Sequence, residues 1–220
     1  MKLIDLKKTY VQGKDVKTQA LKGLDLEFEE GEFAAVSGPS GSGKTTLLNL
    51  MGGLDAPTSG QVYLKDTNIG ELKENQLAHV RLMNFGFIFQ AYNLIPVLTA
   101  EENIEYIMML RGVSRQERRK RVYDMARHLG IDELLHKKPN EMSGGQQQRV
   151  AVARAVVSKP RIVFADEPTA NLDSTNSANL LDLMRQLNDE EKMTFVFSTH
   201  DPVVIEKARR RIILRDGKIA

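Results

Sequence analysis

The chain has 220 residues, and its 31 basic and 29 acidic side chains leave a formal net charge of +2, too balanced to indicate nucleic-acid binding. Hydrophobic residues make up 41% and charged residues 27%, which is ordinary for a globular chain able to bury a large core. The absence of cysteine excludes a disulfide scaffold, a zinc–thiolate site and a cysteine nucleophile, and it fits a reducing compartment.

The sequence predicts neither a signal peptide nor a membrane span. Residues 1–13 alternate apolar and charged side chains and lack the apolar centre of a signal peptide. The best apolar candidate, residues 104–110, includes Glu105 and is far shorter than the roughly 18 residues of a membrane span. We therefore expect that the chain does not cross a membrane by itself.

The first half of the chain predicts strands around a glycine-rich loop. Residues 2–10 and 20–29 alternate partly, as strands do, and a polar turn at residues 12–15 separates them. Residues 33–37 are a short apolar strand, and the helix after the loop ends at Gly52 and Gly53. Further strands are predicted at residues 61–64 and 85–89.

The second half predicts helices first and then alternating strands and helices. Thr99 with Glu102, and Ser114 with Glu117, have the spacing of a capping box, and Gly130 follows the second predicted helix. A further helix begins at Ser143 and ends before Pro160. The remaining predicted elements are strands at residues 162–165, 194–198 and 211–214, with helices from about 174 and 201.

Short apolar strands alternating with helices predict an α/β chain with parallel strand pairing. Residues 96–140 contain no strand pattern and predict a helical subdomain. Because the strand pattern resumes after it, we predict one domain over residues 1–220, with the helical subdomain at about 96–140 inside it.

The glycine-rich loop matches the pattern G-x-x-x-x-G-K-[ST] between a strand and a helix. With glycine at about 7% of residues, a chance match in such a chain is expected in about one sequence in a hundred. The pattern implies backbone N–H groups turned toward phosphate oxygens, with Lys44 reaching the β- and γ-phosphates and Thr45 binding Mg²⁺. The candidate phosphate-binding residues are Gly38, Pro39, Ser40, Gly41, Ser42, Gly43, Lys44, Thr45 and Thr46.

An acidic pair, Asp166 and Glu167, follows the apolar strand at residues 162–165. In enzymes with a phosphate loop such an aspartate holds Mg²⁺, usually through water, opposite the threonine. Glu167 is then placed to orient and deprotonate a water for attack on the γ-phosphate, which predicts hydrolysis. Alone, this pair would more often cap a helix, so the prediction depends on the phosphate loop.

The run Met142-Ser143-Gly144-Gly145-Gln146-Gln147 resembles the LSGGQ signature of the ATP-binding-cassette (ABC) ATPases, and it shortly precedes the acidic strand as in that family. Ser143 alone would fit a helix cap, but two glycines after a cap fit close approach to a γ-phosphate. The resemblance covers essentially the whole chain. It implies a P-loop NTPase core of the ABC type, with an antiparallel β subdomain and a helical subdomain inserted after the Q-loop.

Other site residues follow from the resemblance alone. Gln90 resembles the Q-loop glutamine that touches Mg²⁺ and the attacking water, and His200 resembles the switch histidine on the γ-phosphate. Asp173 belongs to a segment that resembles the D-loop, and Tyr10 resembles the aromatic that stacks on adenine; a strand aromatic also serves in cores. Two positions depart from the family: Met142 replaces the usual leucine and Asn171 replaces a common alanine.

The resemblance also implies a dimer that shares its sites. Each ATP would lie between the phosphate loop of one subunit and the signature of the other. Lys44, Asp166, Glu167 and His200 would then act with four signature residues of a second copy. These residues are Ser143, Gly144, Gly145 and Gln146. ATP would drive homodimerisation, and hydrolysis would separate the pair.

Residues 90–103, QAYNLIPVLTAEEN, resemble the lipoprotein-release, macrolide-export and FtsE-type group (MacB, LolD, FtsE). This implies the ATPase subunit of a bacterial ABC transporter, held on the cytoplasmic face of the cell membrane by a separate MacB/FtsX-like permease. The alternative is an FtsE-like signalling ATPase that regulates a periplasmic partner through an FtsX-like protein without moving a substrate. Candidate permease contacts, equally compatible with buried core, are Leu94, Ile95, Pro96 and Leu98.

Overall fold

A four-stranded antiparallel sheet forms one side of the molecule, in the order β2-β1-β4-β5. The computed structural model describes residues 1–12 and 16–220, so the turn predicted at residues 12–15 falls mostly outside the described residues. The strands of this sheet are β1 (Lys2–Gln12), β2 (Val16–Glu27), β4 (Ser59–Leu64) and β5 (Thr67–Asn68). The long pair β1 and β2 begins and ends at different residues from the predicted strands but in the same region.

A second sheet of six strands has the order β10-β9-β3-β8-β7-β6, and all neighbours except β10 and β9 are parallel. β3 and β8 are buried along their whole length, which explains their nearly continuous apolar sequences. Its strands are β3 (Phe33–Ser37), β6 (Phe85–Ile88), β7 (Ile162–Asp166), β8 (Thr194–Thr199), β9 (Arg210–Arg215) and β10 (Lys218–Ile219).

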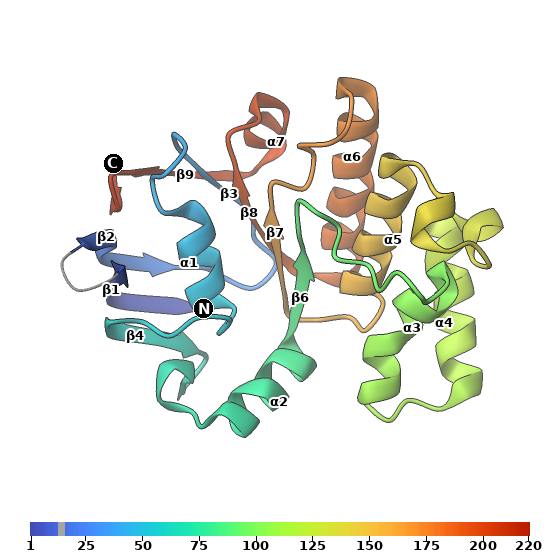
Figure 1. Cartoon of the computed structure of the whole chain (residues 1–220), viewed down its shortest axis with the longest axis horizontal. Coiled ribbons are helices and arrows are strands. Elements are labelled where there is room, and N and C mark those ends of the chain that lie inside the picture. Colours follow the sequence, from blue (N-terminus) through green and yellow to red (C-terminus); the bar gives the residue numbers. More distant parts are fainter. Residues whose placement is uncertain (13–15) are drawn as a thin grey trace.

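Helix α1 (Lys44–Met51) lies between the two sheets, as Figure 1 shows. Its side chains Leu47, Leu50 and Met51 are almost fully buried in a core that also contains residues of both sheets. The other face of the parallel sheet is covered by α5 (Gly144–Val156) and α6 (Ser174–Glu191). The short α7 (Pro202–Lys207) joins β8 to β9.

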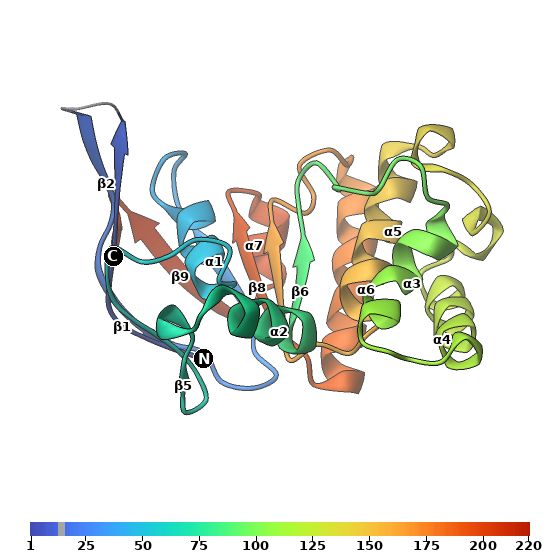
Figure 2. The same cartoon turned by 60° about the horizontal axis from the view of Figure 1, so that its bottom comes forward.

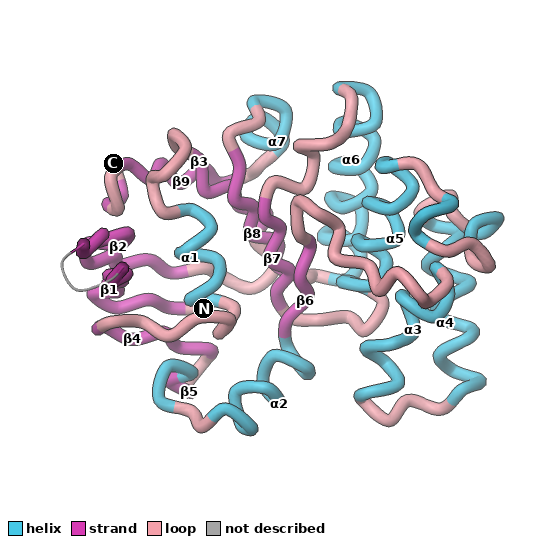
Figure 3. Tube along the Cα trace, in the orientation of Figure 1, coloured by secondary structure: helices cyan, strands magenta, loops and turns pink. Residues whose placement is uncertain are grey.

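The segment between β6 and α5 contains helices and, in the described part of the chain, no strand. It lies at one end of the molecule (Figures 2 and 3). α3 packs against α5 and α4, and its side chains Ile104 and Met108 are fully buried. The elements of this segment are α3 (Ala100–Leu110), α4 (Arg115–His128), η2 (Asp132–Leu134) and η3 (Pro139–Glu141). Within residues 1–12 and 16–220, no helix combines the length and the apolar character that a bilayer crossing requires.

Several local features differ from the sequence prediction. The short strands β5 and β10 were not predicted, and two further differences concern helices. α2 (Glu74–Asn84), after the short η1 (Ile69–Glu71), was not predicted, because it begins after a lysine and buries no side chain fully. The capping box predicted at Ser114 is only half formed. The Ser114 hydroxyl accepts the Glu117 N–H, but the Glu117 carboxylate bonds to Arg121, 2.7 Å away, instead of returning to the cap. The box at Thr99 is complete.

Candidate active site

The glycine-rich loop joins the carboxyl end of β3 to the start of α1, and two of its glycines are required by close backbone approach. A Cβ on Gly38 would lie 2.0 Å from the Leu214 carbonyl oxygen of β9. Gly43 has φ of +104°, and a Cβ there would lie 2.7 Å from the Ala20 carbonyl oxygen of β2. The loop is thus wedged between strands of both sheets, and its backbone, with the first turn of α1, is fixed as an anion site.

Lys44 is the first residue of α1, and its side chain returns over the loop. The ammonium donates to the carbonyl oxygens of Gly38 at 2.9 Å and Pro39 at 3.1 Å. The residue is only 7% exposed. A positive charge held by two neutral carbonyls, beside a helix N-terminus, favours binding of an anion at this place.

Oxygen ligands for a divalent cation meet beside the loop. The Thr45 hydroxyl donates to the Asp166 carboxylate at the end of β7, 3.1 Å away. Hydroxyl and carboxylate oxygens are ligands that Mg²⁺ prefers, and in nucleotide sites one or two carboxylates act with substrate phosphates and waters. Among residues 1–12 and 16–220 no three acidic, histidine or cysteine side chains cluster as a metal cage. The residues present therefore fit a Mg²⁺ that a nucleotide helps to hold.

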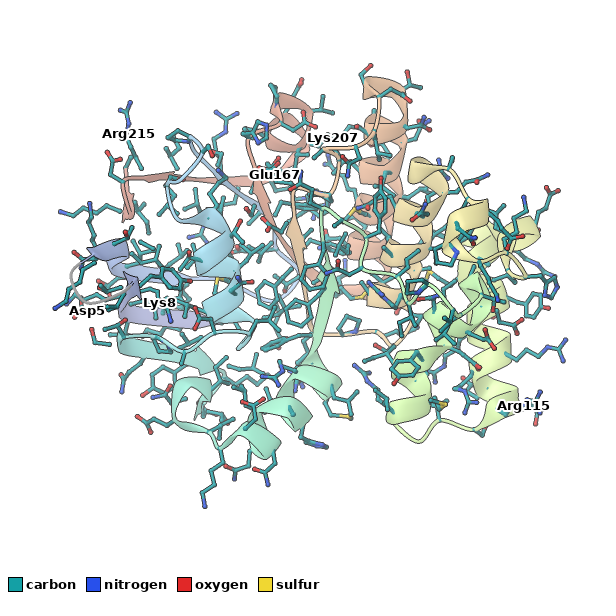
Figure 4. All side chains as sticks on the ribbon, in the orientation of Figure 1. Asp5, Lys8, Arg115, Glu167, Lys207 and Arg215 are labelled. Atoms are coloured by element: carbon teal, nitrogen blue, oxygen red, sulfur yellow. The ribbon has the colours of Figure 1, made fainter. Side chains whose placement is uncertain are left out.

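Glu167 is held at the mouth of the site by β8 and the residue after it. Its backbone has φ of +45°, a strained value for a side chain other than glycine, and its N–H bonds to the Ser198 carbonyl oxygen. The carboxylate accepts from the Thr199 hydroxyl at 3.0 Å and contacts His200 Nδ1 at 2.7 Å. The Glu167 side chain is 14% exposed, whereas the His200 ring is 72% exposed. Figure 4 shows Glu167 beyond the end of β7.

Most of the predicted site residues line one cavity of about 920 Å³. Asp166 is absent from its lining but bonds to Thr45, which lines it. Gly38 and Ser42 are also absent from the lining, and Ser42 is 2% exposed. The predicted residues in the lining are Tyr10, Pro39, Ser40, Gly41, Gly43, Lys44, Thr45, Thr46, Gln90, Glu167 and His200.

Sequence reasoning missed the part of the cavity wall that comes from β2 and from the turn between β9 and β10. This turn is fixed to both neighbours, because Gly217 N–H donates to the Ser42 carbonyl and Lys22 N–H donates to the Gly217 carbonyl. No local motif marks these residues, since only the docking of the two sheets brings them to the loop. They are Thr18, Gln19, Ala20, Lys22, Asp216 and Gly217.

Tyr10 stands at the side of the cavity on β1. Its hydroxyl donates to Asp55 at 2.9 Å, and the Lys8 ammonium lies 4.9 Å from the ring centroid. A phenol is neutral at physiological pH, and burial, the largest of several effects, raises the pKa of the Tyr10 phenol further. A neutral ring, anchored at its tip and 37% exposed, is suited to stacking on a flat aromatic ligand.

With ATP, the ligand that the sequence resemblance implies, we expect Tyr10→Ala to raise KM about tenfold with kcat within about twofold, because stacking contributes equally to ground and transition states. Tyr10→Phe should leave KM within about twofold, since it keeps the ring. Steady-state hydrolysis over a range of ATP concentrations measures both. An unchanged KM in Tyr10→Ala would show that adenine does not stack on this ring.

The predicted signature residues lie outside this cavity. Ser143 caps α5: its hydroxyl accepts the Gln146 N–H at 3.3 Å, while the Gln146 side chain accepts the Ser143 N–H at 2.9 Å. Asp173 is likewise outside the lining and caps α6 through Asn176 at 2.9 Å. Hydrogen bonds from Asn176 lower the pKa of the Asp173 carboxyl. Within one copy, therefore, the loop and the signature do not face the same space.

Comparisons with known proteins match this architecture over most of the chain. The family model described as "ABC transporter" matches residues 21–170. An ABC transporter ATP-binding protein of Thermotoga maritima is 43% identical over 219 residues, covering 100% of this chain and 93% of the relative. The macrolide export ATP-binding/permease protein MacB of Hyphomonas neptunium is 45% identical over 219 residues, and this chain spans 34% of its length.

Two solved structures agree closely with the fold. A dimeric bacterial ABC transporter cassette matches with a TM-score of 0.93 and 42% identity, covering 99% of this chain and 95% of that chain. A dimeric post-hydrolysis state of the same cassette, bound to ADP and Pi, matches with a TM-score of 0.92, 42% identity and the same coverage of both chains. The predicted family resemblance and fold class are thereby confirmed.

Proposed function

This chain belongs to the ABC transporter family of ATP-binding proteins, and from this premise we propose that two copies bind two MgATP between them and hydrolyse it to drive a separate membrane permease. The chain is an ATP hydrolase of the ABC type. We further propose that residues 1–220 act as one ATP-binding domain, in which residues 96–140 form the helical subdomain.

The observation that carries the proposal is that one copy places the predicted phosphate loop and the predicted signature apart from each other. The phosphate loop, Glu167 and His200 line an open cavity, while Ser143 stands elsewhere at the start of α5. The start of α5, with its two glycines, is suited to bind an anion, but it does not line the cavity in which the nucleotide of its own copy would lie. The similar cassette has been solved as a dimer, which supports closing this cavity with the signature of a second copy.

The proposed reaction uses the residues in these positions. The Glu167 carboxylate takes a proton from a water whose oxygen attacks the γ-phosphorus, and the bond to the leaving ADP oxygen breaks. Lys44 and His200 stabilise the charge that develops on the phosphoryl oxygens. Thr45, Asp166 and Gln90 would hold Mg²⁺, which neutralises phosphate charge when bound. Products are ADP and inorganic phosphate.

Light scattering of the Glu167→Gln variant, with and without MgATP at matched concentration, tests the shared site. We expect a monomer without nucleotide and a dimer with MgATP, because the blocked reaction leaves ATP in place between the copies. A monomer under both conditions, with ATP binding demonstrated independently, would contradict the two-copy site.

We propose that the permease is of the MacB/FtsX-like, lipoprotein-release or macrolide-export type, and that it holds the subunit at the cytoplasmic membrane face. The identity of 45% to a MacB protein, of which this chain spans 34%, supports this subgroup. Of the predicted contacts, Pro96 is exposed, while Leu94 packs on the core and Ile95 and Leu98 are half-buried. The adjacent Val97, 73% exposed, was missed by the sequence analysis.

Val97 stands on a loop that Asn103 fixes from inside. The Asn103 side chain is fully buried and bonds to Ile95 N–H at 2.8 Å and to the carbonyl oxygens of Ile95, Leu98 and Thr99. A rigid loop that exposes an apolar side chain is suited to contact an apolar segment of a partner. We therefore propose Val97 as a permease contact.

We expect Val97→Glu to reduce the permease's stimulation of hydrolysis about tenfold in proteoliposomes, because the contact would bury a charge. The basal hydrolysis of the isolated subunit should stay within about twofold, since Val97 does not line the ATP cavity. Ile219→Glu is the control, because it also replaces an exposed apolar side chain by glutamate, on β10 at 40% exposure. It should keep full stimulation. Equal stimulation of both variants would remove Val97 from the interface.

A further inference from the structure

The segment that follows Gln90 is held against α5 by one side chain. Arg154 donates through Nη2 to the Tyr92 carbonyl oxygen at 2.8 Å and through Nη1 to the Asn93 carbonyl oxygen at 2.5 Å. Tyr92 and Asn93 have φ of +61° and +50°, two consecutive residues in a conformation that side chains disfavour. Such a pair persists only where other contacts fix it. Tyr92 N–H and Asn93 N–H bond within the turn itself, to the carbonyls of Phe89 and Ala91, and the Arg154 guanidinium adds a contact from another element.

Arg154 makes these bonds without a compensating negative charge. No carboxylate in the described part of the chain forms an ion pair with it, and burial lowers the pKa of its guanidinium. A half-buried cation directed at neutral carbonyls is electrostatically costly. The planar fork, which reaches two carbonyls at once, is a geometric feature that no apolar or lysine side chain reproduces.

The same segment also reaches the signature. The Tyr92 hydroxyl oxygen lies 2.8 Å from where a Cβ on Gly144 would be, so the ring touches the first turn of α5. Gly144 and Arg154 are about 15 Å apart along the helix, at 1.5 Å per residue. Tyr92 is therefore in contact with both ends of α5, by its carbonyl at one end and by its hydroxyl at the other.

A second side chain fixes Gln90 itself. Asn171, the residue that departs from the family's common alanine, donates from Nδ2 to the Gln90 carbonyl oxygen at 2.9 Å. The segment 90–93 is thereby bonded to the loop before α6 and to α5, while Gln90 also lines the ATP cavity. Movement of this segment has to be accompanied by movement of α5, or its bonds to Arg154 break.

We propose that Arg154 is a positioning residue that fixes segment 90–93 on α5 and so sets the orientation of Ser143 toward the ATP of a second copy. The inference rests on the proposed shared site. Through Arg154, a displacement of segment 90–93 would move α5 and, with it, the signature at the start of that helix. Arg154 touches neither the cavity nor Ser143, so its effect is on assembly and not on ATP binding within one copy.

Arg149 offers a matched control on the same helix. It also donates to a backbone carbonyl, that of Leu129 at 2.8 Å, and has no bond to segment 90–93. Arg154→Met and Arg149→Met therefore each remove a guanidinium and carbonyl bonds from α5. Only the first releases segment 90–93, so a difference between them reports on the link and not on the general stability of the helix.

Both variants are to be made in the Glu167→Gln chain, with two readouts: binding of a fluorescent ATP analogue and the protein concentration of half-dimerisation in MgATP by light scattering. We expect Arg154→Met to keep nucleotide affinity within about twofold and to weaken dimerisation about tenfold. Arg149→Met should change dimerisation less than about threefold. Arg154→Lys, which keeps the charge but not the fork, should behave like Arg154→Met and serves if that variant does not fold.

Equal dimerisation of the Arg154 and Arg149 variants, beside a parent that dimerises, would overturn this inference alone. Loss of nucleotide affinity in Arg154→Met would also overturn it, because the effect would then lie within one copy. A Glu167→Gln parent that does not dimerise would overturn the proposed shared site, and this inference with it.

Discussion

Replacing Glu167 by glutamine is expected to lower ATP hydrolysis by about 10²–10⁴-fold, the usual contribution of a general base, with ATP affinity within about twofold. Glutamine keeps the shape of the side chain and bonds with Thr199 and His200, which hold the carboxylate at 3.0 Å and 2.7 Å in the unsubstituted chain. It cannot accept the proton of the attacking water. The expected loss therefore falls on kcat and leaves the ground state intact.

Hydrolysis is to be measured as phosphate release at saturating MgATP, and affinity as equilibrium binding to the same preparation. Glu206→Gln, an exposed glutamate on the nearby α7, makes the same chemical change outside the cavity and should keep full activity. If Glu167→Gln hydrolyses ATP as fast as this control, another group takes the proton.

Removal of the Lys44 amine should act on binding and on reaction together. We expect Lys44→Ala to weaken ATP binding at least about tenfold and to lower hydrolysis about 10²–10³-fold, because a buried cation placed at the phosphates stabilises both bound ATP and the developing charge. The residue is 7% exposed, and its ammonium lies over the loop on the carbonyls of Gly38 and Pro39. α1 contains no other lysine that could replace this amine.

Isothermal titration with MgATP and steady-state hydrolysis measure the two effects. Lys65→Ala, whose amine pairs with Glu30 at 3.5 Å on the surface, is the matched control and should match the unsubstituted chain. A thermal melt shows whether loss of the bonds from Lys44 to the loop carbonyls destabilises the fold, and we expect both variants to stay folded. A folded Lys44→Ala chain with weakened affinity then reports the loss of the contact between the amine and ATP. Lys44→Ala with unchanged ATP affinity would remove the lysine from the phosphate site.

The phosphate loop, the acidic pair and the caps at Thr99 and Ser143 were predictable because each is contained in a few consecutive residues. Glycines at set spacing determine a loop conformation directly, and an apolar strand that ends in Asp166 and Glu167 places them at the carboxyl edge of a parallel sheet. The missed helix α2 shows the limit of such patterns. It begins after Lys73, and Leu77 and Val80 pack only partly on the core.

The phosphate loop and the pair of carboxylates were thus determined by the sequence alone, because bonding between neighbouring residues sets their geometry. The family followed from the motifs that contain them. The tertiary structure decided which distant residues complete the site. Lys22 reaches the cavity only because β2 docks on the loop, and Arg154 meets segment 90–93 across 61 and 62 positions of the chain. Such contacts depend on strand register and on how helices pack, and no short pattern in the sequence encodes either.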